Sequence, residues 1–514
     1  MRNRKKGVLV LGLTMAALCA SVSSGFAQEH TRDAGPPKPP ATTTKPTGMW
    51  LPKTVAYIKG SNTTKGHQFG SATALSADGN TLAVGATSED SAAKGVNGVS
   101  KDRAVNSGAV YVYTRDNNGW KQQAYLKASN TARGAQFGSS LSLSADGNLL
   151  AVGSPGEASS ATGINGNQSD TSMPSSGAAY VFARTGGAWS QQAYVKPSNT
   201  GGPDIGYQFG FAVSLSGDGS TLAVSQTSDP SNATGINGDQ KNTAAADSGA
   251  VFVFARSGRT WSQQAYVKAA MPTPNLLFGY SVGLNGKGDT LGVGAYNDTG
   301  RRGAVYVFTR NNGTWSQQTR LLASNGQVGD YMGCSMAISD DGNTIVSGTV
   351  EDKYAQINAG AGRDVLDSVG GAYVFVRAAG QWSQQAYVKA FNPRENDQFG
   401  WAVAISRDGN TIAVGSHLED SGANGVNGDQ SSASSEDSGA VYVYTRTGTT
   451  WNPTAYVKAS NTKPAAEFGI SVALNGDGKM LAVGATKENS AAKGVNGNQD
   501  DKSALNAGAA YLYY

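Results

Sequence analysis

The stretch FGISVALNGDGKMLAVGA, residues 468–485, recurs along the chain and decides its fold. It opens with a Phe-Gly pair, continues with alternating apolar and small residues, and reaches a second apolar run through an Asp-Gly turn. Such alternation is typical of strands, and Asp-Gly between two strands indicates a tight hairpin because these residues tolerate positive φ. Related stretches give seven copies in all, the others beginning at Phe69, Phe137, Phe209, Phe278, Tyr331 and Phe399.

Each copy is followed by two further expected strands. In the first copy, residues 69–76 and 81–86 form the hairpin (positions A and B), a long loop leads to residues 108–113 (position C), and residues 123–127 follow a short turn (position D). The repeat is roughly 54 to 72 residues long and shows no helical period. Four antiparallel strands per repeat predict an all-β, seven-bladed β-propeller.

The two ends of the chain carry complementary pieces of the repeat. Residues 54–59 match position D but precede the first position A, and the chain ends at residues 508–514, a position C with no D after it. An unpaired strand edge would leave backbone groups without hydrogen bonds. We therefore expect residues 54–59 to pair with residues 508–514 and close the ring.

The first 53 residues differ in composition from the repeats. Residues 1–27 hold four basic residues and no acidic ones, followed by an apolar run and small residues, which predicts a signal peptide cleaved after Ala27. Residues 28–53 are rich in Pro and Thr and predict a flexible linker, so that residues 54–514 form the propeller. We expect a secreted, periplasmic or cell-surface protein with no integral membrane span after cleavage.

Charge argues against a nucleic-acid partner. The full chain has 41 basic and 37 acidic residues, and removing the four basic residues of the signal leaves 37 of each. A neutral mature chain lacks the basic footprint that nucleic acids require. Cys334, the one cysteine of the mature chain, is interpreted as a small packed residue, and we expect a monomer.

The repeated motifs resemble the FG-GAP repeat, which builds the seven-bladed propeller of integrin α subunits and occurs in many bacterial exported proteins. The resemblance covers nearly the whole mature chain and implies ligand recognition at the loop face. Integrin-type repeats often carry a calcium loop between strands A and B, but here the turns hold too few carboxylates. Asn475-Gly476-Asp477-Gly478 comes nearest and lacks the leading acid. We expect no metal in these turns.

Two residue types recur in register at position D. Lysines near its end are interpreted as charges that protect the outer edge of each blade. Tryptophans at its start are interpreted as packing between blades rather than as sugar-stacking sites. The lysines are Lys59, Lys127, Lys196, Lys268, Lys389 and Lys458, and the tryptophans are Trp120, Trp189, Trp261, Trp315, Trp382 and Trp451.

Binding is expected on the face that carries the B–C and D–A loops, because the A–B and C–D turns on the other face are short. Most B–C loops contain Gly-x-Asn-Gly, interpreted as a turn, whereas the fourth loop, residues 296–302, is short and leaves a notch. In the copies beside this notch, large residues follow the Phe-Gly pair, whereas the first two copies have Ser71 and Ser139 at that position. We predict a ligand-binding patch, with inter-blade packing as the alternative role, made of Phe211, Tyr280, Trp401 and Tyr296.

No catalytic motif is evident. The three histidines of the mature chain have no metal-ligand spacing, and neither a nucleophile elbow nor a phosphate loop is present. Acidic pairs such as Glu89-Asp90, Glu351-Asp352 and Glu419-Asp420 open the B–C loops and are interpreted as solvated charge rather than as a glycosidase pair. We expect a non-enzymatic binding or adhesion propeller without a cofactor, whose ligand is an extracellular protein or matrix. A carbohydrate-binding propeller is the alternative, followed by a polysaccharide-active enzyme.

Overall fold

The structure is a computed structural model that describes residues 52, 55–201, 206–358 and 362–514. The predicted signal peptide, residues 1–27, lies outside the described residues. Of the predicted linker, residues 28–53, only Pro52 is described.

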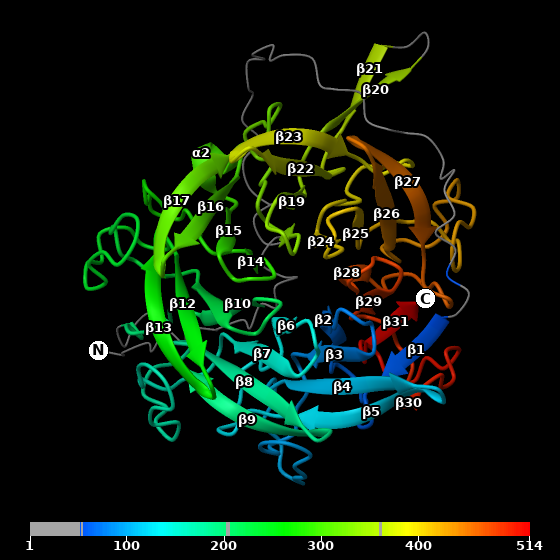
Figure 1. Ribbon diagram of the computed structural model, residues 1–514. Helices are drawn as coiled ribbons and strands as arrows, with labels where there is room; N and C mark the ends of the chain where they lie inside the picture. Colours follow the sequence, from blue (N-terminus) through cyan, green and yellow to red (C-terminus); the bar gives the residue numbers. More distant parts are fainter. Residues whose placement is uncertain (1–51, 53–54, 202–205, 359–361) are drawn as a thin grey trace, which may run out of the picture.

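Seven four-stranded antiparallel sheets surround a central axis, which confirms the predicted propeller (Figure 1). The strands of each sheet are hydrogen-bonded in the order A, B, C, D, with D on the outer rim. Blades 1 to 3 are β2 (Phe69–Leu75), β3 (Thr81–Ala86), β4 (Ala109–Asp116), β5 (Gly119–Leu126); β6 (Leu141–Leu143), β7 (Leu149–Ser154), β8 (Ala178–Thr185), β9 (Ala188–Val195); and β10 (Phe209–Leu215), β11 (Thr221–Gln226), β12 (Ala250–Ser257), β13 (Thr260–Val267).

The remaining blades follow the same plan. Blades 4 to 7 are β14 (Val282–Leu284), β15 (Thr290–Ala295), β16 (Ala304–Asn311), β17 (Thr314–Leu321); β18 (Met336–Ile338), β19 (Thr344–Thr349), β22 (Gly371–Ala378), β23 (Gln381–Val388); β24 (Ala402–Ile405), β25 (Thr411–Ser416), β26 (Ala440–Thr447), β27 (Thr450–Val457); and β28 (Phe468–Leu474), β29 (Leu481–Ala485), β31 (Ala509–Tyr513), β1 (Val55–Lys59). Three short additions lie in B–C loops: α2 (Asp298–Arg301) in blade 4, the hairpin of β20 (Tyr354–Asn358) and β21 (Gly362–Leu366) in blade 5, and β30 (Gly494–Val495) in blade 7.

The ring closes between its two ends, as predicted. Strand β1 is the outer strand of blade 7 and runs antiparallel to β31, with Val55 opposite Tyr513 and Ile58 opposite Ala510. Figure 1 shows the blue β1 beside the red β31. The closure is well packed, because Tyr57 is fully buried with its ring centroid 5.4 Å from that of Tyr511.

The Phe-Gly pair joins each blade to the one before it. In blade 2, the backbone N–H of Phe137 donates to the carbonyl oxygen of Ser107 in blade 1, at 2.9 Å. The next residue, Gly138, has φ +93, and a Cβ there would lie 2.6 Å from the carbonyl oxygen of Ala109. The Phe137 ring packs edge-on against Tyr180 of its own blade. Glycine is therefore required for the close approach, and phenylalanine fills the gap between sheets.

The fifth copy shows a one-residue correction to the sequence interpretation. Tyr331 does not occupy the phenylalanine position. Met332 occupies that position, because it forms the parallel β-bridge to Gly303 of blade 4 and its N–H donates to the carbonyl oxygen of Arg302 at 3.0 Å. Methionine fills this inter-blade space because its side chain is long, apolar and flexible.

Among the described residues, seven apolar clusters lie one between each pair of neighbouring blades, and an eighth, smaller cluster contains Phe211, Tyr280 and Tyr296. Between blades 1 and 2, for example, Val110 and Leu126 pack with Leu150 and Val152. Every blade thus buries both faces of its sheet, and stability is shared around a closed ring.

The tryptophans pack between blades, as predicted. The indole N–H of Trp189 in blade 2 donates to the side-chain oxygen of Gln123 in blade 1, at 2.8 Å. The same bond joins four further pairs: Trp261 to Gln192, Trp315 to Gln264, Trp382 to Gln318, and Trp451 to Gln385. These indoles serve the inter-blade contacts.

The interpretation of the lysines was wrong. The six lysines at the end of position D are fully buried, and each forms an ion pair with an acidic residue near the start of its own blade's B–C loop. The pairs are Lys59–Glu488, Lys127–Glu89, Lys196–Glu157, Lys268–Asp229, Lys389–Asp352 and Lys458–Glu419, at 2.6 to 3.0 Å. Burial is the physical reason: the B–C loop folds over the end of strand D and encloses both charges, which then require each other.

The acidic pairs were also misinterpreted in part. Glu89, Asp352 and Glu419 are buried in these ion pairs rather than solvated. Blade 4 departs from the plan, because Leu322 stands where the other blades have lysine. There Arg320 binds Asp298 instead, with Nε donating to Oδ2 at 2.9 Å.

Candidate functional site

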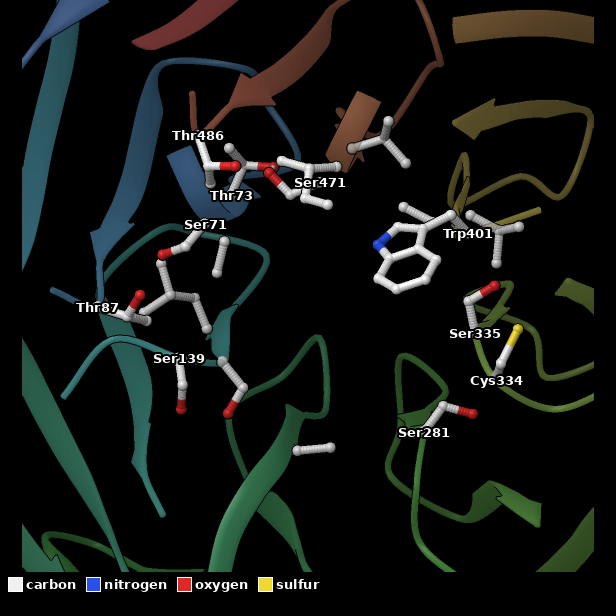
Figure 2. Close-up of a pocket in the computed structure, with 18 of the residues that line it drawn as sticks. Ser71, Thr73, Thr87, Ser139, Ser281, Cys334, Ser335, Trp401, Ser471 and Thr486 are labelled. Carbon is white, nitrogen blue, oxygen red and sulfur yellow. Dashed lines mark hydrogen bonds between the residues drawn. The ribbon is translucent and has the colours of Figure 1, made fainter. Parts of the chain in front are cut away.

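A hollow of about 500 Å³ opens at the mouth of the central channel, and residues of position A from all seven blades line it (Figure 2). Successive residues after each Phe-Gly pair form its wall in layers. The outermost layer includes Ser71, Ser139, Tyr280, Cys334, Trp401 and Ile470. Since one residue of each repeat faces the axis at every level, small changes in the repeat decide the chemistry of the hollow.

The middle layer of the wall is polar and tied to the neighbouring blade. The hydroxyl of Ser335 in blade 5 donates to the carbonyl oxygen of Gly400 in blade 6, at 2.7 Å. Ser140, Ser281 and Ser471 make the corresponding bond to the equivalent glycine of the next blade. The layer below is mainly apolar and consists of Thr73, Leu141, Val213, Val282, Met336, Val403 and Val472. These bonds fix the wall, so the hollow is preformed.

The structure brings the four predicted residues into one apolar cluster, in which Phe211, Tyr280 and Tyr296 are buried and Trp401 packs against them. The rings of Phe211 and Tyr280 lie 5.1 Å apart and those of Tyr280 and Tyr296 lie 4.4 Å apart, and all three side chains are buried. Tyr280 lines the hollow, whereas Phe211 and Tyr296 are absent from its lining. Their packing supports the framework of blades 3 and 4, and their role in binding remains a prediction.

Trp401 packs against that cluster and is the large aromatic side chain that reaches into the hollow. Figure 2 shows its indole extending from the side of Cys334 and Ser335 toward the opposite side, where Ser71 and Ser139 lie. It is half-buried, and its ring is 4.2 Å from the His417 ring. Burial, and secondly the charge of Lys487, lower the pKa of His417 to about 3. A neutral imidazole therefore supports the indole across the physiological pH range.

Polar residues that the sequence interpretation missed form one rim of the hollow. Glu467 and Lys487 make an ion pair at 2.6 Å, and the hydroxyl of Thr486 donates to Glu467 at 3.0 Å. Gln68 and Thr87 hold the equivalent positions in blade 1. Their repeat positions, immediately before the Phe-Gly pair and after strand B, were the available signal.

The Gly-x-Asn-Gly motif has a specific structural role. In blade 2, the N–H of Asn165 donates to the carbonyl oxygen of Tyr194 at 2.8 Å, and its side-chain oxygen accepts the Tyr194 N–H at 2.9 Å. Asn97, Asn237, Asn427 and Asn496 repeat this pair of bonds in blades 1, 3, 6 and 7. The motif turns the loop, as predicted, and also covers the outer edge of strand D.

One buried carboxyl group predicts an unusual pH dependence. Asp397 is fully buried beside Glu419, and its Oδ1 has no hydrogen-bond partner among the described residues. Burial, and secondly the Glu419 charge, raise the pKa of Asp397 to about 8. The native state therefore keeps a proton that the unfolded chain loses near pH ~4, so the free energy of unfolding falls as the pH rises from about 4 to 8.

The substitution Asp397→Asn should remove this loss of stability at high pH, because the asparagine amide stays neutral. We expect the melting temperatures of variant and parent to agree near pH 4 to 5 and the variant to be more stable at pH 8 to 9, by a few kcal/mol at most. Thermal unfolding across this range checks it, with the exposed Asp102→Asn as the control. A difference that does not change with pH would contradict the assignment.

The A–B turns use their carboxylates internally. Asp78 accepts hydrogen bonds from the Asn80 N–H at 2.9 Å and from the Ser76 hydroxyl at 2.5 Å. Within the described ranges, no group of three or more His, Cys, Asp or Glu side chains is arranged to hold a metal ion. No helix in the described part of the chain is long and apolar enough to cross a membrane.

The FG-GAP repeat family model matches four segments of the chain: residues 120–182, 315–375, 382–444 and 451–513. Each segment begins near strand D of one blade and ends in strand C of the next. No curated protein matches the chain.

Two solved structures are similar at low identity. One is the Cps50 (Swd1) β-propeller domain of Myceliophteria thermophila, with 10% identity over 89% of this chain and 99% of that one, at a TM-score of 0.48. The other is the hydrazine synthase of Kuenenia stuttgartiensis, with 12% identity over 83% and 94% of the chains, at a TM-score of 0.45. Neither likeness bears on the function of this chain.

Proposed function

We propose, from the premise that this chain is an FG-GAP repeat protein folded as a seven-bladed β-propeller, that it is an exported, non-catalytic binding or adhesion protein. Its ligand is an extracellular or cell-surface protein or matrix component that approaches the face of the B–C and D–A loops and inserts a group into the channel mouth. The signal-like pattern of residues 1–27 supports export.

The observation that carries this proposal is the preformed hollow with Trp401 in its wall. Apolar and aromatic concavities with a few polar groups are the usual ligand sites of proteins. Here the indole of Trp401 offers an apolar face, while the Glu467–Lys487 pair and nearby hydroxyl groups offer hydrogen bonds at the rim. A protruding side chain of a protein ligand would find both kinds of contact in one place.

A carbohydrate ligand is the second candidate, and the same lining favours it. Sugars stack on indole faces and bond through hydroxyl groups, and Ser and Thr side chains face Trp401 across the hollow (Figure 2). Binding would occur at this single axial site rather than at repeated sites between blades. The inter-blade tryptophans are engaged with glutamines there.

The state of the loop carboxylates supports a non-catalytic role. Glu89 and Glu419 are held in buried ion pairs, and Asp90 pairs with Arg103 on the surface. A glycosidase requires two carboxyl groups that face the same substrate. Incubating the protein with polysaccharides tests the enzymatic alternative, and release of reducing ends would overturn this part of the proposal.

Trp401→Ala should weaken ligand binding about tenfold or more without unfolding the ring. Losing one buried aromatic contact of ~1.4 kcal/mol corresponds to a factor of ten in affinity. Parent and variant should be compared on a glycan array and on immobilised extracellular-matrix proteins. Trp382→Ala is the matched control, because this indole is also half-buried but lies between blades 4 and 5. Full binding by Trp401→Ala to the ligand that the screen identifies would contradict the proposed site.

A further inference from the structure

The outer edges of most blades are closed by their own B–C loops. In blade 1, Asn97 exchanges two hydrogen bonds with the backbone of Tyr125, and the N–H of Lys127 donates to the carbonyl oxygen of Gly95 at 2.9 Å. The loop thus acts as a short fifth strand on strand D. Equivalent contacts occur in blades 2, 3, 6 and 7, including the β1–β30 pairing. An exposed strand edge invites pairing with other chains, and these loops prevent it.

Blade 4 lacks this cover. Its B–C loop is the short turn around α2 and contains no Gly-x-Asn-Gly. Arg320 of β17 lies opposite Tyr306, just as Tyr125 of blade 1 lies opposite Tyr111. Arg320 therefore has the same register as Tyr125, and its backbone N–H and C=O point outward from the sheet. Among the described residues, no hydrogen bond is made by the N–H groups of Arg320 or Leu322. We call residues 320–322, which are the last two residues of β17 and the residue after it, the open edge.

The surroundings of the open edge are apolar and basic. Leu322 is 47% exposed and Val328, in the following D–A loop, is 60% exposed. Met271, in the preceding D–A loop, is 67% exposed. It occupies the position that Asn62 and Asn130 hold in other D–A loops, where each asparagine binds the buried carboxylate of the next blade. Such side chains are rare on the rest of the described surface, so their grouping around blade 4 is specific.

Two exposed arginines add charge to this region. Arg301 is the last residue of α2 and Arg302 follows it. The carbonyl oxygen of Arg301 accepts the N–H groups of Gly329 and Tyr331, which places it against the loop of Val328. Neither guanidinium forms an ion pair with another described residue. Asp298 is already neutralised by Arg320.

We propose that the open edge docks an extended, acidic segment of a partner protein, which adds to blade 4 as a fifth strand. The outward N–H and C=O groups of β17 supply main-chain hydrogen bonds, as in other cases of strand addition. Apolar side chains of the segment contact Leu322 and Met271, and its carboxylates pair with Arg301 and Arg302. This surface lies on the outer rim of the ring and is separate from the channel mouth (Figure 1).

The test is a selection of displayed random octapeptides on the purified mature chain. We expect enriched peptides to alternate acidic with apolar or β-branched residues, and their affinity, measured by fluorescence anisotropy, to fall with added salt. The double charge reversal Arg301→Glu/Arg302→Glu should weaken these peptides at least tenfold. Leu322→Pro should weaken them as well, because it removes an outward N–H at an edge position that tolerates proline.

The controls separate this site from the channel mouth and from misfolding. Trp401→Ala should bind the enriched peptides like the parent chain, so a failure of the proposed function leaves this test intact. Circular dichroism and thermal unfolding show whether each variant folds. If Leu322→Pro does not fold, the Arg301→Glu/Arg302→Glu variant alone tests the proposal. The proposal would be overturned if the selection enriched basic peptides or no peptides at all. Unchanged peptide binding by the Arg301→Glu/Arg302→Glu variant would also overturn it. So would a dimer of the parent chain in sedimentation that Leu322→Pro abolishes, because the edge would then belong to a second copy.

Discussion

A chain that lacks residues 54–60 should melt roughly 10 °C below the parent chain. The deletion removes β1, and with it the buried side chains of Tyr57 and Ile58 and the partner of the buried Glu488. Losing two large core residues costs about 2–5 kcal/mol each, and an unpaired buried carboxylate costs about 3–5 kcal/mol more. The entropy of unfolding is ~2 cal/mol/K per residue, or about 0.9 kcal/mol/K for a ring of about 460 residues. A loss of stability on the order of 10 kcal/mol therefore lowers the melting temperature by roughly 10 °C.

Differential scanning calorimetry of the mature chain measures this effect. Deleting residues 40–46, in the predicted linker, is the matched control and should leave the melting temperature unchanged. The shortened chain should also associate more readily, because β31 would present an unpaired edge. Equal melting temperatures for the parent and the chain without residues 54–60 would contradict the closure of the ring by β1.

Lys196→Met should be the most damaging single substitution in blade 2, at about 3–5 kcal/mol. The Lys196 ammonium group donates to Glu157 at 2.9 Å, to the Ser176 hydroxyl at 2.8 Å and to the carbonyl oxygen of Gly177 at 2.6 Å. Both charged groups are buried. Removing the lysine leaves the Glu157 carboxylate enclosed without a countercharge, and burial of an unpaired charge is strongly unfavourable. Denaturant unfolding of the variant gives the change in stability.

A double variant isolates the effect of the unpaired charge. Lys196→Met/Glu157→Gln removes both charges but keeps an acceptor for the Tyr194 hydroxyl and the Asn130 amide, so it should be more stable than Lys196→Met alone. The exposed pair Lys121–Asp116 provides the control, because Lys121→Met should cost less than about 1 kcal/mol. Similar costs at positions 121 and 196 would show that the buried pairs carry no special weight.

The sequence predicted the fold well because its determinants are local. A two-residue period and an Asp-Gly turn define the A–B hairpin, and the observed β3 matches the expected residues 81–86. The spare strand at the start and the missing strand at the end predicted the closure through β1 and β31. Repetition strengthened each inference, since seven copies show the same pattern.

The lysines were misinterpreted because their partners are distant in the sequence. Glu157 precedes Lys196 by 39 residues, and nothing local shows that the B–C loop folds over the end of strand D. The spacing nevertheless recurs closely, with 38 residues between Glu89 and Lys127 and 39 between Glu419 and Lys458. A nearly constant separation of opposite charges across repeats was therefore the signal for buried pairs.

The candidate site was predictable only in part for a related reason. The sequence marked Phe211, Tyr280 and Trp401 as unusual at one repeat position. Which of them faces the hollow depends on packing between blades: Phe211 is covered behind Tyr280, whereas Trp401 rests on His417 and reaches inward. The rim residues Glu467 and Lys487 were not identified because ordinary polar residues carry no motif.

Fluorine NMR of protein labelled with 5-fluorotryptophan tests the central claim most directly, using the ligand that the array and matrix screen identifies. The Trp401 resonance can be assigned with Trp401→Phe. Addition of the ligand should shift the Trp401 resonance and leave those of the inter-blade tryptophans, such as Trp261 and Trp315, in place. A ligand that binds while the Trp401 resonance stays unchanged would contradict the assignment of the channel mouth as the binding site.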